Sequence, residues 1–183
     1  MDAFESVVEM LLRREGYWTR TSFKVELTPS EKRRINNPTA PRWEIDVVAY
    51  SGGRNEILAV ECKSFLDSSG VTFRNGTFDP ERRYKLFTDA TLRRTVLARL
   101  KRQLVDARAC GKNPTVTLCL ATGRIAATTR NLKEHFARKG WRLFDTDWLC
   151  ERLRAAADAG YENDVAHVVA KMICRNASRM SAS

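Results

Sequence analysis

Apolar residues recur at three- and four-residue spacing at the start of the chain, which predicts an amphipathic helix. Gly16 ends the pattern, and Asp2 and Glu5 have the spacing of a capping box for the first turn. Residues 17–27 then mix aromatic, threonine and valine residues as a strand does. The buried stripe of the helix is formed by Phe4, Val7, Val8, Leu11 and Leu12.

Two stretches lack a regular period. Residues 28–42 carry three prolines and two asparagines, which predicts a long exposed loop. Residues 64–89 are punctuated by Gly70, Gly76 and Pro80, and we expect a long loop or a small insertion there.

Two short strands separate these stretches, one over 43–50 and one over 56–63. The connection 51–55 contains two glycines and has hairpin length, so the strands should pair antiparallel.

The second half of the chain alternates helical and strand patterns, which predicts an α/β fold with a mixed central sheet flanked by helices. A length of 183 residues favours a single domain over residues 1–174, with a core over about 3–144, and a polar tail over 175–183. The predicted elements are a helix over 91–110, a strand over 116–121, a helix over 127–139, a strand over 141–144, and C-terminal helices over 147–157 and 165–173.

The net charge of +10 indicates an anionic partner. Residues 70–112 hold eleven Lys or Arg against four Asp or Glu, a net of +7, so the polyanion-facing part should be the loop and helix after Lys63. Nucleic acid leads the candidates, with DNA preferred. A membrane surface is a distant alternative because no stretch approaches 18 consecutive apolar residues, and the absence of a signal-peptide pattern favours the cytoplasm.

Cysteine and histidine usage excludes several kinds of site. The five cysteines are scattered and form no CxxC, which suits reduced thiols and argues against structural zinc. Only two histidines are present, His135 and His167, so designs built on paired histidines are disfavoured.

Candidate chemistry lies at the end of the strand over 56–63. Because side chains alternate along a strand, Glu61 and Lys63 share one face, and hairpin pairing can bring Asp46 close to Glu61. Two neighbouring carboxylates suit a divalent cation such as Mg²⁺, and a lysine beside them can stabilise charge on a phosphate. The alternative is a solvated Glu-x-Lys face, but the apolar run 57–60 indicates an internal strand that ends in these charges.

These residues resemble a known family. The pattern consists of Ile45-Asp46-Val47-Val48 and Glu61-Cys62-Lys63, with fourteen residues between Asp46 and Glu61, and of Glu5, Leu11-Leu12 and Gly16-Tyr17 upstream. It is similar to the PD-(D/E)xK nucleases, which include many restriction enzymes, Holliday-junction resolvases and repair exonucleases. The similarity spans roughly residues 3–122, over which the elements follow the order of that family's core. It implies a restriction-endonuclease-like fold and nuclease activity with Mg²⁺, for which Mn²⁺ can substitute.

The resemblance also implies roles for single residues. Asp46, Glu61 and the Cys62 carbonyl would hold the metal, and Lys63 would assist the attacking water. Glu5 would complete the site, with Glu9 as the alternative acid and the capping box as the alternative role of Glu5.

At two positions, 107 and 45, the chain departs from the family's pattern. Gln103 resembles a glutamine of the exonuclease branch, which would give it a catalytic role, whereas Ala107 stands where that branch has a tyrosine. Ile45 stands where the family motif usually has proline, a common variation.

Basic residues are the candidates for phosphate contact: each alone is better explained as a solvated surface charge, but the cluster with its net charge of +7 favours phosphate contact. The aromatic residues Phe73, Phe78 and Tyr84 either stack on bases or anchor the long loop to the core. The candidate nucleic-acid-binding residues are Lys32, Arg33, Arg34, Arg82, Arg83, Lys85, Arg93, Arg94, Lys101 and Arg102.

The sequence therefore predicts a metal-dependent deoxyribonuclease, more readily an endonuclease. A non-cutting nucleic-acid-binding module on the same fold and an RNA-processing nuclease stay open as alternatives. The final helices are either contacts of a homodimer or part of the core.

Overall fold

The computed structural model describes residues 2–37, 39 and 42–180, and its centre is a mixed sheet of five strands in the order β1-β2-β3-β6-β7. β1, β2 and β3 pair antiparallel, whereas β3, β6 and β7 are parallel. The chain thus has the predicted α/β architecture with a mixed sheet. The strands are Trp18–Val25 (β1), Trp43–Ser51 (β2), Glu56–Lys63 (β3), Thr115–Thr122 (β6) and Arg142–Phe144 (β7).

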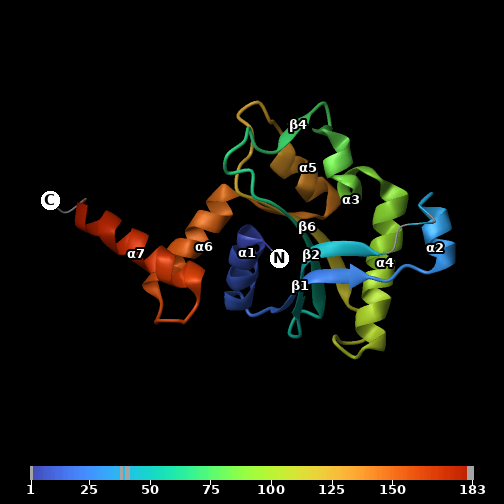
Figure 1. Cartoon of the computed structure of the whole chain (residues 1–183), viewed down its shortest axis with the longest axis horizontal. Coiled ribbons are helices and arrows are strands. Elements are labelled where there is room, and N and C mark those ends of the chain that lie inside the picture. Colours follow the sequence, from blue (N-terminus) through green and yellow to red (C-terminus); the bar gives the residue numbers. More distant parts are fainter. Residues whose placement is uncertain (1, 38, 40–41, 181–183) are drawn as a thin grey trace.

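Helices cover both faces of the sheet, and each face has its own buried core. α1 (Ala3–Arg14) and α6 (Thr146–Asp158) pack on one face, and α4 (Ala90–Asp106) and α5 (Leu132–Lys139) on the other. Figure 1 shows α1 and α4 on opposite sides of the strands. β2 and β3 are therefore covered from both sides, and for β3 this confirms the internal strand that the apolar run 57–60 predicted.

The capping box predicted for the first helix is confirmed. The Glu5 backbone N–H donates to the Asp2 carboxylate at 2.8 Å, and the Asp2 N–H donates to the Glu5 carboxylate at 3.1 Å. The helix runs over Ala3–Arg14 and buries Val8, Leu11 and Leu12, which belong to the predicted stripe.

The prediction of a loop over 28–42 was wrong in its first part, because α2 (Pro29–Arg34) forms there; residues 38, 40 and 41 lie outside the described part. Thr28 and Glu31 form a capping box, and Pro29 starts the helix, where its missing N–H costs nothing. Glu31 then accepts hydrogen bonds from the Arg99 guanidinium at 2.9 Å, which ties α2 to α4.

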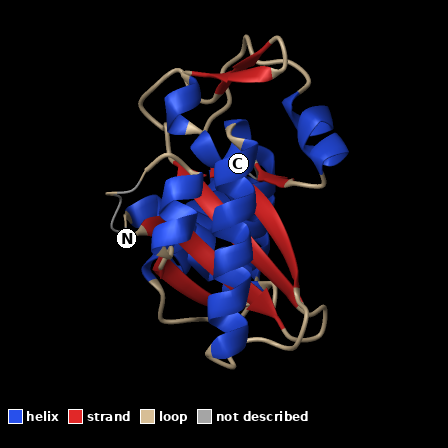
Figure 2. Ribbon diagram, turned by 90° about the vertical axis from the view of Figure 1, so that its right-hand side faces the viewer, coloured by secondary structure: helices blue, strands red, loops and turns tan. Residues whose placement is uncertain are grey.

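The stretch 64–89 is a small insertion with its own structure. β4 (Thr72–Arg74) and β5 (Thr77–Asp79) form a two-stranded sheet, followed by a 3₁₀ turn over Glu81–Arg83 and by α3 (Lys85–Thr88). Asn75 and Gly76 join the strands with φ of 52° and 83°, as a two-residue hairpin turn with positive φ at both positions requires. Figure 2 shows this hairpin beyond one end of the large sheet.

The three aromatic residues of this insertion anchor it. Phe73, Phe78 and Tyr84 are 2–3% exposed, and the Phe78 and Tyr84 rings stack with centroids 4.4 Å apart. These residues therefore anchor the insertion to the core, and their rings are too buried to stack on bases.

The C-terminal part differs from the predicted tail. α5 begins at Leu132, five residues after the predicted start, and α7 runs over Val165–Met180, so most of the predicted tail 175–183 is helical. Good helix formers such as Arg, Ala and Met extend a helix that the preceding apolar residues have already started; residues 181–183 lie outside the described part.

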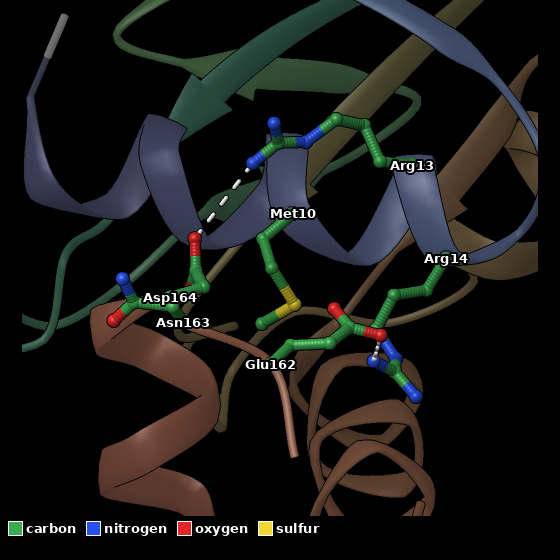
Figure 3. Close-up of a pocket in the computed structure, with 6 residues that line it drawn as sticks. All are labelled: Met10, Arg13, Arg14, Glu162, Asn163 and Asp164. Atoms are coloured by element: carbon green, nitrogen blue, oxygen red, sulfur yellow. Dashed lines mark hydrogen bonds and ion pairs between the residues drawn. The ribbon is translucent and has the colours of Figure 1, made fainter. Parts of the chain in front are cut away.

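Ion pairs attach the start of this region to α1. Arg13 lies 3.7 Å from Asp164, and Arg14 forms an ion pair with Glu162. These residues line a hollow together with Met10 (Figure 3). Across residues 2–37, 39 and 42–180, no helix combines the length and apolar character needed to cross a membrane.

Candidate active site

The charged end of β3 lies where the sequence placed it. Leu58, Val60 and Cys62 enter the core beneath α1, and Ala59 enters the core beneath α4. Alternation then directs Glu61 and Lys63 to the same face as Ala59. The Lys63 Nζ lies 3.7 Å from the Glu61 Oε2, and the two side chains are 23% and 15% exposed.

Asp46 meets β3 where the strand pairing stops. The β2–β3 register runs from Ser51–Glu56 to Val47–Val60, and beyond it the Cys62 backbone N–H donates to the Asp46 Oδ2 at 2.6 Å. The pairing of β1 with β2 is also interrupted at Asp46, opposite Ser22, whose φ is 48°. The carboxylate of Asp46 thus replaces a backbone acceptor and is held in place by β3.

Burial and neighbouring charge perturb both carboxylates. Burial, followed by the charge of Asp46, raises the pKa of Glu61 to about 7, although Lys63 acts in the opposite direction. Burial also raises the pKa of Asp46, against the lowering effect of the Cys62 N–H and of Lys63. Burial and repulsion thus disfavour the charged forms of both acids, and a divalent cation between them would offset that cost.

Of the two acids on α1, Glu5 belongs to this neighbourhood. Burial raises the pKa of Glu5, and the charge of Asp46 contributes to that rise. Glu9 instead accepts a hydrogen bond from the Thr19 hydroxyl at 2.9 Å. Glu5 therefore combines its capping role with a position close enough to affect Asp46 and Glu61.

Cys62 can offer its carbonyl oxygen to a metal but not a thiolate. Its side chain is 9% exposed, and burial followed by the charges of Asp46, Glu5 and Glu61 raises the pKa of the thiol. Within the described part of the chain, no three histidine, cysteine or acidic side chains form a preorganised ligand cluster. The donor set on offer is therefore Asp46, Glu61 and backbone oxygen, all hard ligands of the kind that Mg²⁺ takes with several waters.

Gln103 is engaged with β1. Its Oε1 accepts from the Glu26 N–H at 2.7 Å, and its Nε2 donates to the Lys24 carbonyl at 3.3 Å. Both bonds join the side chain of Gln103 to the backbone at the end of β1, so its amide has a clear structural role between α4 and β1.

Most of the candidate phosphate contacts lie on two packed helices. Lys32, Arg33 and Arg34 form the last turn of α2, which Glu31 attaches to α4. Figure 1 shows α2 beside α4. The remaining candidates comprise Arg82 and Arg83 in the 3₁₀ turn, Lys85 on α3, and Arg93, Arg94, Lys101 and Arg102 on α4.

Arg93 differs from the others in this set. Its Nη1 donates to the carbonyls of Leu86 and Phe87 at 3.1 Å, and its guanidinium lies 4.9 Å from the centre of the Trp141 ring. Burial lowers its pKa. We therefore assign Arg93 to the packing of α3 against α4.

Three further arginines, Arg74, Arg130 and Arg138, line one hollow. Sequence reasoning missed them because they are spread over 64 positions of the chain and only the tertiary fold brings them together. The Asn75-Gly76 turn was the one local signal that could have indicated the hairpin on which Arg74 lies.

Comparisons with known proteins add little. No family model matches the chain, and no curated protein matches it. A similar solved structure is described as "Crystal Structure of Protein of Unknown Function AF1548"; it is 15% identical, and the match covers 98% of this chain and 97% of that one with a TM-score of 0.42. At that TM-score the similarity supports no conclusion about this chain.

Proposed function

We propose that this protein is a metal-dependent nuclease that hydrolyses phosphodiester bonds of DNA at the Asp46–Glu61–Lys63 edge of the sheet. The observation that carries the proposal is the meeting of two partly buried carboxylates whose pKa values are both raised, with a lysine 3.7 Å from one of them. We further propose that the sheet and its helices form a restriction-endonuclease-like core, in keeping with the resemblance of the motif.

The residues present fit a divalent cation. Asp46, Glu61 and the Cys62 carbonyl would hold Mg²⁺, with Mn²⁺ as a substitute, and Glu5 would act close by. When bound, the ion would lower the pKa of a coordinated water and polarise a phosphoryl oxygen.

The chain's own groups then have separate tasks. The Cys62 N–H orients the Asp46 carboxylate. Glu61 accepts or holds a proton near neutral pH, because its pKa lies at about 7 without metal. Lys63 is exposed enough to reach solvent while its ammonium stays beside Glu61, so it can hold a water or offset charge that develops on the phosphate.

The alternative is a module that binds nucleic acid without cutting it. Acidic side chains near a phosphate weaken such binding, so a pure binder gains nothing from Asp46 and Glu61. The net charge of +10 and the basic α2–α4 surface support a nucleic-acid partner under either proposal.

The decisive experiment compares Asp46→Asn with the wild type. Asparagine keeps the shape but removes one charge, so cleavage of DNA in Mg²⁺ should be abolished. In EDTA the variant should bind DNA as well as the wild type or more tightly, because repulsion of the phosphate falls. With Ca²⁺ as a non-cleaving ion, the wild type should gain affinity and the variant should gain much less.

Asp158→Asn is the matched control, because Asp158 is an exposed residue at the end of α6. It should leave cleavage and binding unchanged. Cleavage by Asp46→Asn at the wild-type rate would refute the metal site. If the wild type cleaves neither linear, circular, single-stranded nor branched DNA, and binds it equally with Ca²⁺ and EDTA, the binding module is the better account; cleavage of RNA alone would favour the RNA-processing role.

A further inference from the structure

A hollow of about 460 Å³ lies between the β4–β5 hairpin and the segment that leads into α5. Arg74 and the Asn75-Gly76 turn contribute from the hairpin, and Thr128, Arg130, Asn131 and Arg138 contribute from the other side. None of these positions has a role in the carboxylate site described above.

The hollow is cationic and nothing in its lining neutralises it. Three arginines line it, and its lining contains no Asp or Glu. Within residues 2–37, 39 and 42–180, none of these three guanidinium groups forms an ion pair, whereas seven other arginines do.

The hollow beside Met10 gives the contrast (Figure 3). There, Arg13 faces Asp164 and Arg14 faces Glu162, so the protein supplies its own anions. Arginines that line one hollow without a carboxylate repel one another and keep N–H donors that no carboxylate occupies, which favours an anion with several oxygen atoms.

The two walls of the hollow, the β4–β5 hairpin and the segment that leads into α5, are joined by hydrogen bonds. The Arg74 Nη2 donates to the Thr128 hydroxyl at 2.9 Å, and the Phe73 N–H donates to the Thr129 hydroxyl at 3.0 Å. The Thr129 hydroxyl in turn donates to the Val71 carbonyl at 2.8 Å. The site is therefore held by the fold and does not depend on the arginines alone for its shape.

The residue at the start of α5 also lines the hollow. Asn131, the N-cap residue, has a φ of 58° and makes no capping hydrogen bond with its side chain. The first N–H groups of the helix therefore have no side-chain cap, and the acidic residue of this turn, Glu134, does not line the hollow.

Both walls begin at the end of the sheet that carries the carboxylates. The chain leaves β3 after Lys63 toward the hairpin, and it leaves β6 after Thr122 toward α5. The Gly123 N–H donates to the Lys63 carbonyl at 3.2 Å, which keeps the two exits together. Figure 2 shows the hairpin beyond this end of the large sheet.

We infer that this hollow binds a phosphate group of the nucleic acid whose cleavage we propose at the Asp46–Glu61–Lys63 edge; the inference rests on that proposed function. One guanidinium group can donate two parallel hydrogen bonds to two oxygens of a phosphate. Phosphate is the anion that a nucleic acid presents. The phosphate is either an internal diester or a terminal monoester, which carries the larger negative charge.

The test uses the double variant Arg130→Gln/Arg138→Gln, which removes two charges and leaves the Arg74–Thr128 bond intact. The matched control is Arg108→Gln/Lys112→Gln, which removes the same charge from two exposed residues after α4; the Lys112 carbonyl accepts a hydrogen bond from the Asn55 amide. Asn55 precedes β3, so the control lies at the opposite end of an eight-residue strand, about 25 Å from Lys63.

Binding of fluorescent duplex and single-stranded DNA is measured in EDTA, with and without a 5′-phosphate, at several salt concentrations. The hollow variant should bind about tenfold more weakly or worse, and the magnitude of its log-log salt slope should fall by about 1 relative to the control. A loss on every DNA would identify an internal diester, and a loss confined to phosphorylated ends would identify the terminal monoester. Equal affinities and slopes for the two variants on all DNAs would refute the inference.

Failure of this test is separable from failure of the proposed function. Binding in EDTA involves no cleavage, and the Asp46→Asn comparison does not depend on Arg130 or Arg138. A hollow that does not bind phosphate beside an active metal site would overturn only the further inference.

Discussion

Replacing Glu61 by glutamine should stabilise the metal-free protein at alkaline pH, which is unusual for a substitution at a charged residue of a proposed active site. Glutamine has nearly the same size as glutamate but carries no charge. It therefore removes the repulsion from Asp46 and the desolvation of a second anion, while the Lys63 neighbour keeps a hydrogen-bond acceptor.

The magnitude follows from the pKa. Glu61 has an ordinary pKa of 4.5, and in the native protein without metal burial and Asp46 raise its pKa to about 7. Between these values only the native state keeps the proton, so its contribution to stability is present at low pH and is lost as pH rises through 7. The loss is about 3 kcal/mol, or roughly 6 to 12 °C in Tm for a chain of this size.

The assay is urea denaturation in EDTA at pH values between 5 and 8.5. The stability of Glu61→Gln relative to the wild type should rise by about 3 kcal/mol across this range. Glu134→Gln, on the exposed surface of α5, should follow the wild type throughout.

Adding Mg²⁺ at pH 8 tests the same carboxylate in its ionised form. The ion should stabilise the wild type by about 3 kcal/mol at a hundredfold excess over Kd and should stabilise the Gln variant much less. Parallel denaturation of Glu61→Gln and wild type at every pH in EDTA would refute the reasoning, because it would mean that Glu61 is neither buried enough nor close enough to Asp46.

Two other predictions concern single side chains. Lys63→Ala should lower the rate of DNA cleavage by roughly 10²-fold or more in a gel assay, with little change in Tm because Lys63 is partly exposed; a large fall in Tm with activity retained would return Lys63 to an ion-pairing role alone. Gln103→Ala should lower the free energy of unfolding by about 1 kcal/mol through its lost bonds to the backbone at Lys24 and Glu26, with cleavage unchanged. A hundredfold loss of cleavage at unchanged stability would instead place Gln103 with the carboxylates.

The sequence was informative where local periodicity and tertiary burial agree. Alternation along β3 predicted that Glu61 and Lys63 share a face, and the two cores bear this out by taking Ala59 on one side and Leu58 and Val60 on the other. The hairpin between β2 and β3 was equally readable because its connection is short and contains two glycines.

Two local signals were missed in stretches whose prolines and glycines led to the prediction of loops. Thr28-Pro29 followed by Glu31 has the pattern of a capping box with proline in the first turn, and it starts α2. Asn75-Gly76 between two short β-branched and aromatic runs is a hairpin signal, and it joins β4 to β5. Both patterns were visible in the sequence.

Other features could not be read locally at all. The interruption of pairing at Asp46, which lets its carboxylate accept the Cys62 N–H, depends on how β1 and β3 flank β2. The proximity of Glu5 to Asp46 depends on the packing of α1. Neither the interrupted pairing nor this proximity leaves a periodic pattern or a characteristic spacing in the sequence.

The energetic conflict at Asp46 and Glu61 is itself an argument for catalysis over binding. A fold gains nothing from two partly buried acids that repel each other. Burial of Glu61, followed by the charge of Asp46, raises its pKa to about 7, which corresponds to about 3 kcal/mol in metal-free protein above neutral pH. That is a large fraction of the roughly 5–15 kcal/mol typical of domains. Glu61→Gln would remove this cost and Asp46→Asn would remove the repulsion, and either change would also strengthen the binding of phosphate. Residues that weaken both stability and anion binding make physical sense where a divalent cation reverses the sign of both effects, because the ion compensates the carboxylates and attracts the phosphate.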